Sequence, residues 1–133
     1  MNEKTKFAKN VIAGAVAQTY SRLTLAASQG LFLYYQDLCP IMYGMHFDRL
    51  SEDQSEALWQ LLAVTMELDA AAGRLPLAAL FVSRRKGEHQ PRAAFYEVYK
   101  KLYGETLDAD GWRKLVERIW QSYAMPPELL ERL

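Results

Sequence analysis

Hydrophobic residues recur at helical spacing over three long stretches of the chain. Between residues 5 and 28 they follow a period of three or four residues, and Gly30 is placed to end the helix. Residues 51–54 have the Ser-x-x-Gln form of a capping box, and apolar residues follow at helical spacing, so a second long helix is predicted over residues 51–72. The third stretch, residues 108–124, has a regular amphipathic pattern and predicts a C-terminal helix.

Two shorter apolar segments favour β-structure. Residues 75–82 form an eight-residue run without charge, which is the length and composition of a strand buried on both faces. Residues 31–35 are aromatic and aliphatic and predict a second short strand. A polar, glycine-bearing turn over residues 83–90 follows the central run, and Pro91 is suited to open a further helix that ends near Gly104.

The predicted fold is therefore mainly α with a small β component, an α+β domain. We expect one compact domain over residues 1–133, with about five helices and a short sheet of two or three strands. Its core would span residues 12–103, followed by the amphipathic helix over residues 108–124 and a short tail over residues 126–133.

Composition narrows the class of protein without identifying it. Of the 133 residues, 50% are hydrophobic, which excludes intrinsic disorder, and 16 basic residues balance 16 acidic ones, so no overall charge favours nucleic acid or a membrane. The one cysteine, Cys39, excludes an intrachain disulfide and agrees with a reducing compartment, so we expect a cytoplasmic protein. No apolar run approaches the roughly 18 residues of a membrane span.

Groups suited to catalysis are sparse. The seven glycines are scattered, and none forms a phosphate-binding loop. His46 and His89 lie far apart in the sequence and have no thiols or carboxylates at metal-ligand spacing. Cys39 lies between Leu38 and Pro40 and is interpreted as a structural residue. We therefore expect no enzyme activity, no cofactor and no metal.

Local clusters of charge remain as candidate sites. The turn and the following helix start carry an excess of positive charge that could contact phosphates, although basic loop tips also serve solubility alone. These candidate nucleic-acid-binding residues are Arg84, Arg85, Lys86 and Arg92, and Lys4, Lys6 and Lys9 could add a basic arm. The helix over residues 51–72 carries five acids and no base. Either three of these acids complement the helix N-terminus, or the acids form a face for a basic protein partner. These candidate protein-interaction residues are Glu52, Asp53, Glu56, Glu67 and Asp69.

Residues 29–38, Gln-Gly-Leu-Phe-Leu-Tyr-Tyr-Gln-Asp-Leu, resemble the segment that opens the second helix in the DNA-binding domain of alkyltransferase-like proteins and related bacterial winged-helix domains. The resemblance implies a winged-helix-like core, with the basic turn as the wing and residues 51–72 near the place of a recognition helix. The Pro-Cys-His-Arg motif of true alkyltransferases has no counterpart at Cys39, so alkyl transfer is not implied. An acidic recognition helix would also be repelled by DNA phosphates.

These observations favour a non-enzymatic interaction protein, such as an adaptor, inhibitor or regulatory subunit, that acts through protein–protein contacts. If the chain comes from a bacterial phage or mobile element, an inhibitor of a host nucleic-acid-binding machine would suit the acidic helix. The alternative is a nucleic-acid-binding module that uses the basic wing. Self-association through residues 112–123 or through the leucine-rich tail is left open by the sequence.

Overall fold

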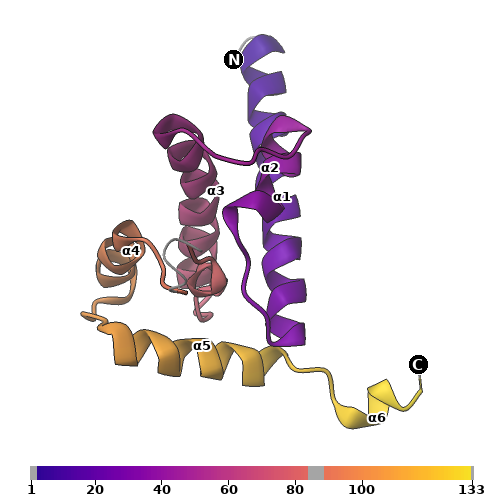
Figure 1. Cartoon of the computed structure of the whole chain (residues 1–133), viewed down its shortest axis with the longest axis vertical. Helices are drawn as coiled ribbons and strands as arrows, with labels where there is room; N and C mark the ends of the chain where they lie inside the picture. Colours follow the sequence, from indigo (N-terminus) through magenta and orange to yellow (C-terminus); the bar gives the residue numbers. More distant parts are fainter. Residues whose placement is uncertain (1–2, 84–88, 133) are drawn as a thin grey trace.

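The computed structural model describes the backbone of residues 3–83 and 89–132, and the side chains of residues 12–83, 89–129, 131 and 132. Within this part of the chain the regular structure is helical (Figure 1). The elements are α1 (Glu3–Gln29), α2 (Tyr35–Tyr43), α3 (Glu52–Ala71), the 3₁₀ helix η1 (Leu77–Leu80), α4 (Ala93–Tyr103), α5 (Ala109–Tyr123) and α6 (Pro127–Leu130).

The predicted α+β fold with a short winged-helix-like sheet is wrong. Among the described residues no strand is formed. Extended backbone segments pair there at two isolated β-bridges, Leu33 with Phe81 and Ser83 with Gln90. The predicted strand over residues 75–82 contains η1 instead. A winged helix needs a sheet to support its wing, so this part of the resemblance does not hold. The described chain is all-α.

The error over residues 75–82 has a physical origin. A short apolar run bounded by polar residues fits a buried helical turn as well as a buried strand. Here the run contains two alanines and a single β-branched residue, Val82, so its composition does not favour extended structure. Burial was predicted correctly, because Leu77, Leu80 and Val82 are almost completely covered.

The observed helix boundaries lie close to the predicted ones, because the predicted capping interactions are formed. Gly30 follows α1 with a positive φ of 67°, a conformation that favours glycine. At the start of α3 the Ser51 hydroxyl accepts from the Gln54 N–H, and the Gln54 side chain accepts from the Ser51 N–H. At the start of α5 Asp108 accepts from the Gly111 N–H at 2.6 Å.

The helices surround η1. Helices α1 and α3 run in the same direction, and α5 lies across the end of α1 (Figure 1). Because α1, α3 and α5 all contact η1, the short segment between α3 and α4 becomes the centre of the core. The indole Nε1–H of Trp112, on α5, donates to the carbonyl of Ala79 at 2.9 Å, which satisfies a buried backbone acceptor that no helix partner reaches.

The C-terminal segment lies apart from this body. Figure 1 shows α6 beyond the end of α5, away from helices α1–α4. Leu129 is exposed there. Among the described residues, none of the helices combines the length and the hydrophobicity of a membrane span.

Substitution of Trp112 tests the central position of η1. We expect Trp112→Phe to lower the free energy of unfolding by about 2 kcal/mol, because it leaves the buried Ala79 carbonyl without a donor and removes part of a buried ring. Trp120→Phe is the matched control, since its indole N–H donates to Leu31 at the exposed surface and its loss should cost less than about 1 kcal/mol. Urea denaturation measures both, and equal losses would contradict the central role of η1.

Candidate functional site

The acidic face predicted on α3 divides into an exposed part and a buried part. Glu52, Asp53, Glu56 and Glu67 are exposed, whereas Asp69 is 0% exposed. Asp69 follows Leu62 by seven residues and Thr65 by four, so it lies on the helix face that packs into the core. That spacing was the available sequence signal for burial, and a carboxylate buried in this way is not accessible to a partner at the surface.

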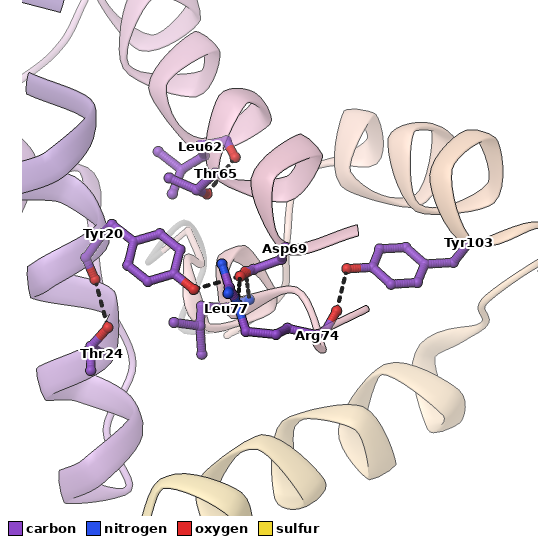
Figure 2. Close-up of polar contacts among 8 residues, drawn as sticks. All are labelled: Tyr20, Thr24, Leu62, Thr65, Asp69, Arg74, Leu77 and Tyr103. Atoms are coloured by element: carbon purple, nitrogen blue, oxygen red, sulfur yellow. Dashed lines mark hydrogen bonds and ion pairs between the residues drawn. The ribbon is translucent and has the colours of Figure 1, made fainter. Parts of the chain in front are cut away.

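The Asp69 carboxylate joins three parts of the chain (Figure 2). The Tyr20 hydroxyl, on α1, donates to Oδ1 at 2.5 Å, and the Arg74 Nε–H donates to the same oxygen at 3.0 Å. The Leu77 backbone N–H, at the start of η1, donates to Oδ2 at 3.0 Å. With three donors and one opposite charge, this buried carboxylate has the partners that burial of a charge requires. We call these four residues the Asp69 network.

Two tyrosines next to the Asp69 carboxylate have raised pKa values. Burial, the hydrogen bond to Asp69 and the negative charge of that carboxylate all raise the pKa of Tyr20 above its ordinary value. Burial, and then the charge of Asp69, raise the pKa of Tyr103 to about 12. The Tyr103 hydroxyl donates to the Arg74 carbonyl at 2.7 Å, so α4 is joined to the same region (Figure 2). The hydrogen bond to Asp69 raises the pKa of Arg74, which keeps its guanidinium charged.

Arg92, which was predicted to contact nucleic acid, is paired with Glu56, which was predicted to contact a protein partner. The Arg92 guanidinium pairs with Glu56 at 3.0 Å, donates to the Tyr35 hydroxyl at 3.4 Å and lies 5.5 Å from the centre of the Trp59 ring. Arg92 and Glu56 therefore neutralise each other on the surface. Arg84, Arg85 and Lys86 lie outside the described residues, as do the side chains of Lys4, Lys6 and Lys9.

The residues considered for catalysis do not converge. Cys39 is completely buried, its thiol donates to the Tyr35 carbonyl at 3.3 Å, and burial raises its pKa, which disfavours the reactive thiolate. His89 accepts from or donates to the Tyr34 hydroxyl at 3.2 Å and packs edge-on against Phe32. His46 is exposed. The described side chains contain no group of three metal-ligating residues.

Sequence reasoning missed an apolar groove of about 930 Å³ between α1 and α3. Ile12, Val16 and Tyr20 line it from α1, and Val64 and Leu68 line it from α3, with Arg74 beyond the end of that helix. Ile12 is 57% exposed and Leu68 is 48% exposed. Helical spacing predicted that Ile12 and Leu68 lie on the packed faces of their helices. The structure leaves their outer faces uncovered, so the groove is a candidate binding site.

Searches of protein-family models, curated proteins and solved structures find no match to the chain. The apolar groove and the Asp69 network are therefore the features from which a function is inferred.

Removal of the Asp69 charge tests the Asp69 network. We expect Asp69→Asn to lower the free energy of unfolding by about 3 kcal/mol, because an amide offers one acceptor oxygen to three donors and leaves Arg74 without its counter-charge. Asp53→Asn, on the exposed start of α3, should change it by about 0.5 kcal/mol or less. Urea denaturation compares the two variants, and a loss no larger than that of Asp53→Asn would contradict the structural role of Asp69.

The raised pKa of Tyr103 predicts a loss of stability at alkaline pH. Above its ordinary pKa of 10.0 the unfolded chain loses this proton, whereas the folded chain retains it until about pH 12. Stability from this group is therefore complete below pH 10 and is lost as the pH rises towards 12. We expect the free energy of unfolding to fall less between pH 9 and pH 11 in Tyr103→Phe than in the unmodified chain. Equal falls would show that Tyr103 does not couple folding to pH.

Proposed function

We propose that the chain is a non-enzymatic protein-interaction module that binds an apolar segment of a protein partner in the groove between α1 and α3. The observation that carries this proposal is the continuous apolar lining formed by Ile12, Val64 and Leu68 next to the buried Val16. A contiguous exposed apolar surface of this kind is typical of a binding site. Covering each of the exposed side chains would contribute up to about 2 kcal/mol to binding.

The walls of the groove support binding by a largely preformed surface. Tyr20 and Arg74 line the groove, and both are hydrogen-bonded to Asp69. The Asp69 carboxylate also accepts a hydrogen bond from the backbone N–H of Leu77, the first residue of η1. Both walls of the groove are therefore joined to the core. A surface fixed before binding has less conformational entropy to lose when a partner arrives.

The chemistry of the lining favours binding over catalysis. Among the described residues that line the groove, Tyr20 and Arg74 are the polar ones. Both stay protonated at neutral pH, because the ordinary pKa of each lies well above 7 and is raised further here. Neither is then suited to act as a nucleophile or general base.

A protein partner is also favoured over nucleic acid. Glu67 is exposed one helical turn from both Val64 and Ala71, so a negative charge lies beside the groove. A phosphate backbone would be repelled there. Nucleic-acid binding by Arg84, Arg85 and Lys86 stays a prediction, and the pairing of Arg92 with Glu56 does not favour it.

An adaptor, inhibitor or regulatory subunit is the role that we propose for such a module. The single, buried Cys39 agrees with action in a reducing compartment such as the cytoplasm. Binding of a partner to one groove would not require a cofactor.

A photo-cross-linker placed in the groove tests this proposal. We expect p-benzoylphenylalanine at Leu68 to cross-link one protein from a lysate of the source cell, and the same group at Gln121, on the exposed face of α5, to give no such product. The second change Ile12→Glu should abolish the product, because it places a charge in the apolar lining, while thermal unfolding stays close to that of the parent.

Mass spectrometry of the product decides the outcome. A protein joined at Leu68, absent at Gln121 and lost with Ile12→Glu supports the groove as the binding site. Equal labelling at both positions, or no labelling at Leu68, contradicts it. A product that contains two copies of this chain would assign the groove to self-association instead.

A further inference from the structure

Arg74 is held in a fixed position at one end of the apolar groove. Its Nε–H donates to Asp69 at 3.0 Å, and its guanidinium carbon lies 5.7 Å from the centre of the Tyr20 ring. The side chain is nevertheless 48% exposed. The Tyr20 hydroxyl also interacts with the Arg74 side chain. Apart from Asp69, no carboxylate among the described residues pairs with this guanidinium, so its exposed part remains able to donate to a ligand through the terminal nitrogens Nη1 and Nη2.

The length of the groove suits two to three turns of a helix. Ile12 and Tyr20 mark its extent along α1 and are eight residues apart, which corresponds to about 12 Å. A helical partner of that length would place apolar side chains at positions i, i+4 and i+7 along the groove. An extended partner has no comparable site, because the described part of the chain contains no strand to which it could add.

Small residues allow a partner helix to approach both walls. Ala13 and Ala17 line the groove from α1, and Ala71 and Ala72 line it from the end of α3. Methyl side chains at these positions leave room for the larger side chains of a partner, since the ridges of one helix pack into the grooves of another. The large residues of the wall, Ile12 and Leu68, then supply apolar contact area.

The Arg74 guanidinium determines which partner helices can bind in the groove. A purely apolar partner would remove water from Arg74 without replacing its hydrogen bonds, which is unfavourable. A carboxylate can accept from both terminal nitrogens in the planar, bidentate geometry that arginine favours. Asp69 already occupies the Nε side, so the partner carboxylate would approach from the groove.

We infer that the partner segment is an amphipathic helix with an aspartate or glutamate at one end of its apolar stripe, and that this carboxylate pairs with Arg74. The inference rests on the proposed function, because it names the chemistry of the partner for the same groove. Arg74 thereby acts as a specificity residue that fixes which end of the helix lies beside Tyr20.

A peptide selection on the full chain tests the inference. The probe is a display library of 16-residue helical peptides with leucine fixed at three positions, i, i+4 and i+7, and the other exposed positions randomised. We expect selected peptides to be enriched in aspartate or glutamate at one end of the leucine stripe. Replacing that acid with its amide should weaken binding by about threefold to tenfold, the range for a partly exposed, bidentate ion pair.

Arg74→Gln is the informative variant of the protein. The Nε2 nitrogen of glutamine is as many bonds from Cα as the Nε of arginine, so a donor to Asp69 is kept while the two terminal nitrogens are removed. In this variant acid and amide peptides should bind within about twofold of each other. Arg113→Gln, which removes a charge from the exposed surface of α5, should leave the acid preference unchanged.

The outcomes separate this inference from the proposed function. Suppose that the selected peptides lose binding to Leu68→Glu, but either show no acid preference or keep that preference in Arg74→Gln. This result would overturn the role of Arg74 and leave the groove as the binding site. If no selected peptide depends on Leu68, both proposals are wrong. A dimer in sedimentation that Leu68→Glu dissociates would identify a second copy as the occupant. Should Arg74→Gln fail to fold, the acid-to-amide peptides on the unmodified chain still decide the question.

Discussion

The Asp69 carboxylate receives hydrogen bonds from α1, from the turn after α3 and from the start of η1. A fully buried charge is tolerated only when its partners are in place, so these three segments must be assembled together. The Leu77 N–H is one of those donors, and it fixes where η1 begins at the centre of the core. The carboxylate therefore joins α1 to α3 and also positions η1, the segment that α1, α3 and α5 surround.

The Asp69 network also connects the core to the surface. Tyr20 and Arg74 each have one side against Asp69 and another side along the apolar groove. The same interactions that stabilise the core thus position the two polar side chains among the described residues that line the groove. A binding surface built in this way is ordered before a partner arrives, which reduces the entropy that binding would otherwise cost.

Local signals in the sequence were sufficient for the capped helices but not for η1 or for the tertiary contacts. The Ser51 and Asp108 caps are formed by neighbouring residues, so they could be predicted. The segment over residues 75–82 was predicted to be buried, and it is, but its helical turn depends on packing against three helices. The pairing of Arg92 with Glu56 joins residues 36 positions apart, and no local pattern indicates it.

The groove could not be predicted for a related reason. Helical periodicity identifies an apolar face, whereas the position of the neighbouring helix decides how much of that face is covered. Val16 is buried and Ile12 is exposed, although both belong to the same apolar face of α1. The Asp69 network was likewise missed because an acid on a helix is usually a surface residue, and the Tyr20 that satisfies it is 49 positions away.

Native-state hydrogen exchange, followed by NMR at increasing denaturant concentration, is the most direct test of the central role of Asp69. If its carboxylate holds the three segments together, the Leu77 amide and the amides around Tyr20 and Asp69 should open in one cooperative unit, with a free energy close to that of global unfolding. If the Leu77 amide instead exchanges by a separate opening of much lower free energy, η1 does not depend on Asp69, and the carboxylate is not the interaction that holds the core together.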